Sequence, residues 1–193
     1  MFKDKSRDYE TDMRFSKRKA DGDDIQRQIC DTCGFINYEN PKIVAGVVAV
    51  WERKILMCKR NIEPRKGFWT LPAGFMEQRE TTQQAAAREA YEEARADIEV
   101  GDLLAIYNIA RISQVQIFYR GKLTSPQIEA GPESMEVGLF DWDEIPWDEL
   151  AFPSVYWALQ YYRETQALHY FPPAREPDDW FKTPGFENLV GEA

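Results

Sequence analysis

The sequence predicts an α/β fold in which a mixed β-sheet lies between helices. Stretches rich in β-branched and aromatic residues precede, separate and follow two segments with helical periodicity. The chain has 193 residues, of which 44% are hydrophobic and 13% aromatic. That composition is sufficient for the core of one domain with extensions at its ends.

The strands are predicted from composition and from the turns between them. KIVAGVVAVW, from Lys42, and KILMCKR, from Lys54, are separated by the short turn ERK and predict a β-hairpin. The loop NIEPRKGFWTLPAGF follows, and its WTLP segment fits a short strand. DIEVGDLLAIYNIA and VQIFYRGKL predict two further strands, and MEVGLFDWDEIP predicts a strand that leads into a turn.

The two helices are predicted from capping and periodicity. Thr81 and Gln84 have the spacing of a capping box, which marks a helix N-terminus ahead of the alanine-rich run QAAAREAYEEA. The second helix is predicted over PSVYWALQYYRETQALHY, because Val155, Leu159 and Tyr162 fall on one helical face.

Composition divides the chain into three parts. Residues 1–40 predict an N-terminal arm that carries mixed charges and the knuckle-like turn Cys30-x2-Cys33-Gly. Residues 41–170 hold the predicted strands and helices of the main domain. Residues 171–193 are rich in proline and predict an extended tail.

Net charge and apolar content exclude several classes of partner. The formal net charge is −9, which repels a nucleic-acid polymer but attracts divalent cations and small nucleotides neutralised by them. The longest apolar run, IVAGVVAVW, has nine residues and is too short to cross a bilayer. There is no apolar signal-peptide core near the N-terminus, and three cysteines do not suggest a disulfide framework, so we expect a cytoplasmic protein.

The first predicted helix crowds three glutamates together. Glu89, Glu92 and Glu93 project within about a 100° arc, and each like-charge pair costs roughly 0.2–0.5 kcal/mol. The negative end of the helix dipole adds to that cost. Such a local conflict is typical of a functional site, and Mg²⁺ bound among the carboxylates would remove the repulsion. A solvated acidic helix face is the alternative.

This segment resembles the Nudix box, G-x5-E-x7-R-E-U-x-E-E-x-G-U. The matching positions are Gly74, Glu80, Arg88, Glu89, Glu92 and Glu93. The one departure is Arg95, where the motif has a glycine suited to a left-handed helix end. The resemblance covers about Gln28 to Tyr170 and looks closest to the FAD and ADP-ribose pyrophosphohydrolase branch. It implies an α/β/α sandwich.

The matching stretches outside the box are ICDTCGFINYENPKIVAG, CKRNIEPRKGFWTLPAGFME and GPESMEVGLFDWDEIPWDELAF. The resemblance implies that Glu89 and Glu93 bind Mg²⁺ or Mn²⁺ directly, with Glu92 sharing a second ion or its waters. The backbone carbonyl of Ala73 resembles a further family ligand. Arg88 then holds the carboxylates in position, and Glu80 supports it.

The chemistry implied is attack of water on a pyrophosphate, completed by a general base outside the box. We expect Glu136 to be that base, with Glu133 as the second candidate, and the alternative for both is an exposed loop glutamate.

The substrate-binding residues are predicted from the strand and loop that precede the box. Arg60 and Lys59 are candidates for phosphate contacts. The aromatic residues Trp69, Phe68 and Phe75 are candidates for stacking on a base or isoalloxazine ring, with a place in the core as the alternative for each.

Cys30 and Cys33 resemble one half of a zinc ribbon. A structural zinc needs four ligands, and no second cysteine pair precedes them. We therefore expect a metal-free remnant, with a zinc shared between two chains of a dimer as the alternative.

The expected activity is Mg²⁺-dependent hydrolysis of FAD to AMP and FMN, or of ADP-ribose to AMP and ribose 5-phosphate. An NADH pyrophosphatase is an alternative, but that group shows S-Q-P-W-P-F-P after the box, where this chain has AIYNIARISQVQIFYRG. A non-catalytic nucleotide sensor is the other alternative, although all four box glutamates are present. The resemblance also implies a homodimer.

Overall fold

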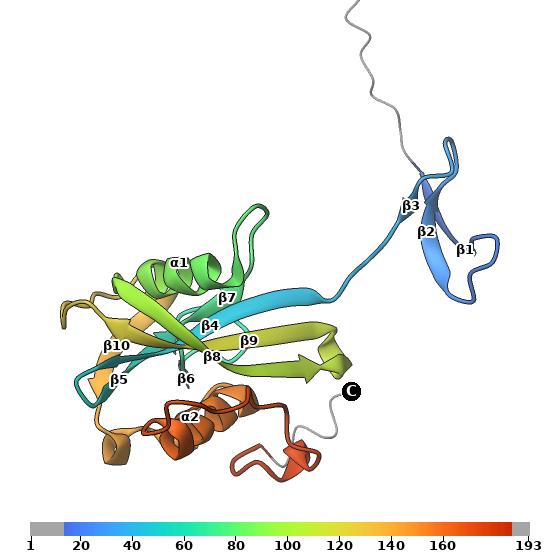
Figure 1. Ribbon diagram of the computed structural model, residues 1–193. Helices are drawn as coiled ribbons and strands as arrows, with labels where there is room; N and C mark the ends of the chain where they lie inside the picture. Colours follow the sequence, from blue (N-terminus) through green and yellow to red (C-terminus); the bar gives the residue numbers. More distant parts are fainter. Residues whose placement is uncertain (1–13, 187–193) are drawn as a thin grey trace, which may run out of the picture. The chain divides into compact units, whose positions relative to one another are not determined.

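The computed structural model describes residues 14–186, which divide into two compact units between Asn40 and Pro41 (Figure 1). In the first unit, strands β1 (Phe15–Lys19), β2 (Gln26–Cys30) and β3 (Ile36–Asn37) form a small sheet in that order. The sequence analysis did not predict β1 and β2, because charged segments such as FSKRK lack an apolar alternation. The first 13 residues of the expected arm lie outside the described residues.

The second unit contains a seven-stranded mixed sheet. Its strands are β4 (Lys42–Trp51), β5 (Lys54–Arg60), β6 (Trp69–Thr70), β7 (Ala73–Phe75), β8 (Ile98–Ile109), β9 (Gln114–Leu123) and β10 (Ser134–Phe140). The strand order is β10-β5-β4-β9-β8, with β6 paired to β5 and β7 to β4. Only β4 and β9 run parallel among the pairs of this sheet that the structure describes.

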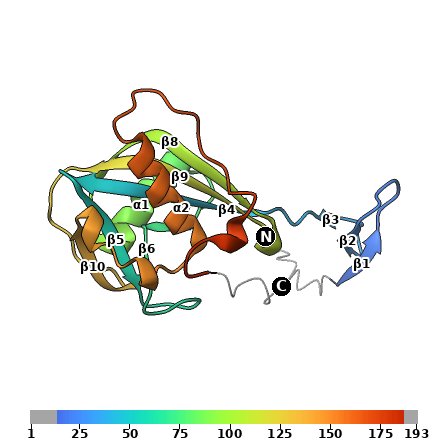
Figure 2. The ribbon, with the colours of Figure 1, turned by 90° about the horizontal axis from the view of Figure 1, so that it is seen from below.

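Helices α1 (Thr82–Ala94) and α2 (Pro153–Thr165) cover opposite faces of this sheet (Figures 1 and 2). Short 3-10 helices follow β8 (Ala110–Ile112), precede α2 (Trp142–Glu144 and Trp147–Glu149) and interrupt the C-terminal segment (Trp180–Lys182). The expected α/β/α sandwich is therefore confirmed. No helix of residues 14–186 combines the length and apolar character that a membrane span requires.

The core has two layers because side chains alternate along each strand. On one face, the buried alanines of α1 pack against residues such as Leu56 and Tyr119. On the other face, α2 packs against residues such as Met57 and Phe118. Alanine side chains let α1 approach the sheet closely, which brings the glutamates of this helix near β7.

The C-terminal part differs from the expectation. Helix α2 ends at Thr165 rather than near Tyr170, and the segment that follows is packed rather than simply extended. Ala174 forms a bridge with Ala105 at the edge of the sheet, and Phe186 is buried in the core on the side of α2. Apolar residues spaced among the prolines account for this packing.

Both ends of α1 are defined by specific interactions. The predicted capping box is confirmed: the backbone N–H of Gln84 donates to the Thr81 hydroxyl, and the Thr81 N–H donates to the Gln84 side chain. At the other end Arg95 adopts the left-handed conformation, with φ of 51° and ψ of 28°. The residue that replaces the motif glycine therefore keeps the glycine-like backbone.

We expect Arg95→Gly to stabilise the protein by about 0.5–1 kcal/mol, because a left-handed non-glycine residue carries about 1–2 kcal/mol of strain. Part of this gain is offset because the Arg95 guanidinium lies over the Tyr91 ring, 5.3 Å from its centroid. Urea denaturation measures the change. As a control, Arg163→Gly within α2 should lower stability by about 1 kcal/mol. A destabilised Arg95→Gly variant would contradict the strain argument.

Candidate active site

The site forms where β7 and the loop after it meet α1. Strand β7 pairs antiparallel with the first half of β4, so Gly74 lies opposite Ala45 and Phe75 opposite Val44. A Cβ atom at Gly74 would lie 2.4 Å from the carboxylate atoms of Glu89. Glycine is therefore required here because the Glu89 carboxylate packs directly on the backbone of β7.

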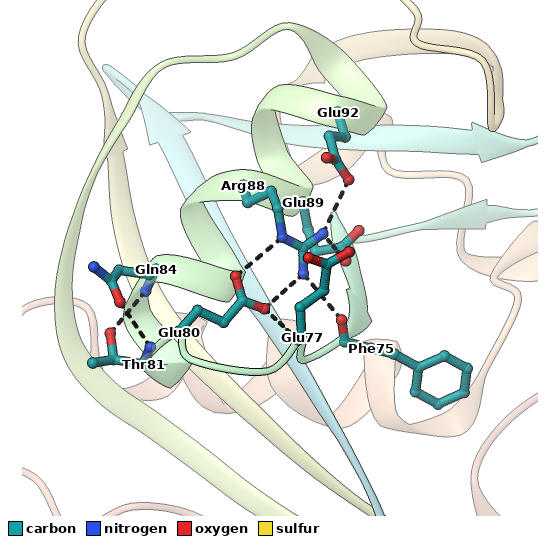
Figure 3. Close-up of polar contacts among 8 residues, drawn as sticks. All are labelled: Phe75, Glu77, Glu80, Thr81, Gln84, Arg88, Glu89 and Glu92. Atoms are coloured by element: carbon teal, nitrogen blue, oxygen red, sulfur yellow. Dashed lines mark hydrogen bonds and ion pairs between the residues drawn. The ribbon is translucent and has the colours of Figure 1, made fainter. Parts of the chain in front are cut away.

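Arg88 is the polar centre of the site (Figure 3). Its Nε and Nη2 donate to the two Glu80 oxygens at 3.1 and 2.8 Å, and its Nη1 donates to Glu89 at 2.7 Å and to Glu92 at 3.0 Å. A fifth bond runs from Nη2 to the Phe75 carbonyl at 3.0 Å. These contacts match the number of N–H donors on a guanidinium, so the side chain is fully satisfied.

The Arg88 hydrogen bonds also set the charge state of Glu80. They hold the pKa of the Glu80 carboxyl below its usual value, and a bond from the Glu77 backbone N–H acts in the same direction. In turn the Glu80 carboxylate raises the pKa of Arg88 more than any other group does. The ion pair between Glu80 and Arg88 thus links the loop before α1 to the middle of the helix.

Glu89 and Glu93 are the two glutamates buried against the sheet, with 8% and 7% of their surfaces exposed. Burial raises the pKa of the Glu89 carboxyl, although Arg88 opposes the shift. Burial first, and then the charge of Glu89, raise the pKa of Glu93 to about 8. By contrast the Glu92 side chain is 55% exposed and bonded to Arg88.

The loop before β10 brings a further carboxylate to this cluster. Its Gly131 N–H donates to the Glu93 carbonyl at 2.9 Å, and the Asn61 N–H donates to the Glu133 carbonyl at 2.8 Å. A Cβ atom at Gly131 would lie 1.7 Å from the Glu92 carbonyl oxygen, so the loop contacts the end of α1 directly. The negative charge of Glu133 contributes to the raised pKa of both Glu89 and Glu93.

Comparison with known proteins identifies the family. The profile of the NUDIX domain matches residues 40–165, well over half of the chain. The chain belongs to the Nudix family. It is similar to the crystal structure of a NUDIX hydrolase from Nitrosomonas europaea, with a TM-score of 0.81 and 42% identity, over 86% of this chain and 95% of that chain.

Two ADP-ribose pyrophosphatases are also similar to this Nudix chain. The one from Methanocaldococcus jannaschii is 31% identical over 119 residues, which are 60% of this chain and 69% of the relative. A crystal structure of the one from Streptococcus suis has a TM-score of 0.56 and 22% identity, over 70% of this chain and 98% of that chain. The second similarity shows a shared fold.

Glu136, which we expected to be the general base, lies on the other side of the sheet from the Nudix box. In β10, Val137 and Leu139 pack into the core layer of α1, whereas Phe140 packs into the layer of α2. Because strand side chains alternate, Glu136 shares the face of Phe140. The structure therefore brings Glu133, and not Glu136, to the Nudix carboxylates.

The two predicted phosphate-binding cations have different surroundings. The positive charge of Arg60 opposes the rise in the pKa of Glu93, so this guanidinium lies near the site. It also lies over the Phe152 ring, 5.1 Å from the centroid. Lys59 instead lies 3.9 Å from a Glu149 carboxylate oxygen and over the Trp69 ring, which places it on the α2 side.

The three aromatic candidates also separate. Trp69 is only 5% exposed and packs edge to face on Phe140 in the core, so it offers little ring surface to a ligand. Phe68 is partly covered by the Arg65 guanidinium, 4.0 Å from its ring centroid. Phe75 is 50% exposed, with the Lys42 amine 5.0 Å from its ring centroid. Of the three, Phe75 is therefore the open ring.

The donor set suits a divalent metal, the kind of cofactor that Nudix enzymes generally use. The charge of Glu133 raises the pKa of Glu89 and of Glu93, the charge of Glu89 also raises that of Glu93, and a cation would compensate this repulsion. Within residues 14–186, no three acidic, cysteine or histidine side chains converge tightly enough to form a metal site. In this arrangement, Arg88 neutralises Glu89 and Glu92.

The cysteine pair lies in the first unit, at the end of β2. Cys30 is buried and Cys33 is exposed. Backbone N–H groups of Cys33 and Thr32 lower the pKa of the Cys30 thiol. None of the described residues adds a third ligand to this pair, and a structural zinc needs four. That the pair binds no zinc stays a prediction.

One feature of the second unit was missed by the sequence analysis. A cavity of about 310 Å³ lies between the first turn of α2, the end of β8 and the C-terminal segment. Tryptophan at positions 157 and 180 lines it, and Trp180 stood in the stretch that we expected to be an extended tail. A large aromatic residue within a proline-rich segment was the available signal.

We expect Glu93→Gln to stabilise the metal-free protein at alkaline pH. Because the pKa of Glu93 is raised to about 8, the folded state holds this proton more tightly than the unfolded chain. Its contribution to stability is complete below the ordinary glutamate pKa of about 4.3 and is lost as pH rises through about 8. The free energy of unfolding of the variant should therefore rise relative to that of the wild type between these two pH values. Above pH 8 the difference should be on the order of a few kcal/mol.

Chemical denaturation in EDTA from pH 4 to 9 measures this difference. Glu92→Gln is the matched control, since Glu92 is exposed on the same helix and should show no such gain. Parallel pH profiles for Glu93→Gln and the wild type would contradict the raised pKa.

Proposed function

We propose that this chain hydrolyses the pyrophosphate bond of a nucleoside diphosphate linked to another moiety, with ADP-ribose and FAD as the main candidate substrates. The observation that carries the proposal is the pair of buried glutamates on α1, Glu89 and Glu93, with Glu89 bonded to Arg88 and the charge of Glu133 nearby. The similarity to an ADP-ribose pyrophosphatase at 31% identity supports the choice of substrate class.

In this proposal Glu89, Glu93 and the Ala73 carbonyl would hold Mg²⁺ or Mn²⁺, with Glu92 turned toward solvent beside them. The metal would shield the phosphate oxygens, position a water molecule and lower the pKa of that water. Arg88 keeps Glu89 in place and fixes the loop through Glu80. The bond to Glu89 keeps this buried carboxylate oriented when no substrate is present.

Glu133 is the proposed general base, in place of Glu136. It would take a proton from the attacking water as the new P–O bond forms and the anhydride P–O bond breaks. The leaving phosphate departs as AMP from FAD or ADP-ribose, and FMN or ribose 5-phosphate is the other product. Arg60, close to Glu93, is the proposed phosphate contact.

The proposal also includes a cytoplasmic homodimer. The net charge of −9 supports a small, metal-neutralised nucleotide rather than a nucleic-acid polymer as the ligand.

Purified protein with Mg²⁺ should convert ADP-ribose or FAD to AMP and the second phosphate product, measured by HPLC. Mn²⁺ is tested in parallel, and NADH and diadenosine tetraphosphate are offered at the same concentration. Glu93→Gln should lose this turnover because it removes a metal ligand. Preferred cleavage of NADH would favour an NADH pyrophosphatase, and binding without any turnover would favour a nucleotide sensor.

Replacing each of the two candidate bases in turn tests the assignment of Glu133. Glu133→Gln should lower kcat by about 10²–10⁴-fold, the usual contribution of a general base. Glu136→Gln is the matched control, two positions past Ser134 on β10 and on the other face, and it should stay within about twofold of the wild type. The reverse pattern would contradict the assignment of Glu133 as the general base.

A further inference from the structure

The cavity beside α2 has a wall made by a segment that the NUDIX profile does not cover. The profile ends at residue 165, whereas residues 176–180 contribute several lining side chains. With a volume of about 310 Å³, the cavity is at the lower end of the range for small-molecule sites. It therefore accommodates one ring with its sugar rather than a whole dinucleotide. The lining residues used below are Asn108, Arg111, Gln116, Trp157, Glu176 and Trp180.

The C-terminal wall is fixed at both of its ends by hydrogen bonds. Before the cavity, the Ala174 N–H donates to the Leu104 carbonyl, and the Ala174 carbonyl accepts from the Ile106 N–H, both at 2.9 Å. After the cavity, Trp157 Nε1 donates to the Thr183 hydroxyl at 2.7 Å. The wall is thus attached to the edge strand β8 and to helix α2.

A further hydrogen bond joins this wall to β8. The Glu176 carboxylate accepts a hydrogen bond from the Asn108 backbone N–H at 2.8 Å and contacts the Asn108 side-chain amide at 3.4 Å. The bonds to Asn108 oppose the effect of burial and leave the pKa of Glu176 below its usual value. Glu176 is therefore ionised at neutral pH and would repel a phosphate group placed beside it.

The remaining surface is suited to a planar ring. Trp157 is held edge to face against Tyr107, with 5.3 Å between ring centroids, and its indole N–H donates to the Thr183 hydroxyl. The Arg111 guanidinium lies over the Trp180 ring, 5.8 Å from its centroid. Within residues 14–186, no carboxylate comes within ion-pairing distance of Arg111. Tryptophan faces and a guanidinium plane are both good stacking partners for heteroaromatic rings.

The cavity is connected to the box by the register of the sheet. Gln116, on the cavity wall, pairs with Val44, and Val44 pairs with Phe75. Two strand spacings separate the backbones of Gln116 and Phe75, which is about 10 Å. Paired residues point to the same face, so the exposed Phe75 ring faces the cavity side, while the preceding residue, Gly74, faces Glu89 on the opposite side of the sheet.

We propose that the heteroaromatic ring of the substrate stacks on Trp180 in this cavity while its diphosphate lies at the Nudix box. Trp180 is then a specificity-determining residue supplied by the C-terminal segment. The inference rests on the proposed function, because it takes a nucleoside diphosphate derivative as the substrate. Adenine and isoalloxazine share the stacking chemistry, and the experiment separates them.

The test compares Trp180→Ala, Trp180→Phe and a matched control, Phe181→Ala. Phe181 is the next residue in the same short helix, is 42% exposed and does not line the cavity. Binding of AMP, FMN and ribose 5-phosphate to the metal-free proteins is measured by calorimetry. This readout needs no turnover, so it separates failure of the inference from failure of the proposed activity.

Trp180→Ala should weaken the binding of AMP or of FMN by about ten- to a hundredfold, the usual effect of losing one aromatic stacking partner. Trp180→Phe should restore most of the affinity, and Phe181→Ala should bind as the wild type does. A loss for AMP alone identifies adenine as the ring, and a loss for FMN alone identifies isoalloxazine. With an active substrate, KM should rise more than kcat falls.

Unchanged affinity of Trp180→Ala for both AMP and FMN would overturn the proposal, and so would a wild type that binds neither. An equal loss for ribose 5-phosphate would also overturn it, since that ligand has no ring to stack. Near-UV circular dichroism shows whether each variant is folded, and Trp180→Leu, which keeps an apolar side chain without a ring, replaces the alanine variant if that variant is not folded.

Discussion

The guanidinium of Arg88 is the interaction on which the acidic helix depends. A helix with three glutamates near its negative end is disfavoured by its own charges, and here one cation bonds to Glu89, Glu92 and the more distant Glu80. The bond to the Phe75 carbonyl extends this network into β7. Because a lysine has only three donors in a compact group, it would leave some of these acceptors without a partner.

Close packing of α1 on the sheet has an electrostatic consequence. Four of the five alanines of the helix are fully buried, and Gly74 admits the Glu89 carboxylate against its backbone. The same approach buries Glu93, and burial, with the charge of Glu89, raises its pKa to about 8. Arg88 opposes the effect of burial at Glu89, to which it is bonded. The folded state therefore maintains a buried acid whose charged form is unfavourable until a cation arrives, which is a cost in stability typical of functional sites.

The sequence was sufficient to predict features that depend on local spacing. It was insufficient for features that depend on strand register or on contacts between distant residues. The capping box and the order of the box residues follow from fixed spacings along one helix, so they were predictable. The face on which Glu136 lies depends on an irregularity between Ser134 and Glu136, and a shift of one residue exchanges the faces of a strand. Trp69 belongs to the core through contacts with Phe140, a residue 71 positions away, which no local pattern reveals.

Chemistry and selectivity must come from different parts of this chain. A diphosphate is common to ADP-ribose, FAD and NADH, so carboxylates and cations that act on it cannot distinguish among them. Adenine is also common to the three, so discrimination among them requires contacts with the group that differs, which a stacking site for the isoalloxazine or nicotinamide ring would supply. A site for adenine would instead select adenine nucleotides over other nucleoside diphosphates. The C-terminal segment lies outside the family's shared region yet is bonded to β8 and α2. Substitution there would alter the ring-binding wall without touching the Arg88 network, so substrate preference is free to diverge among relatives that share one catalytic helix.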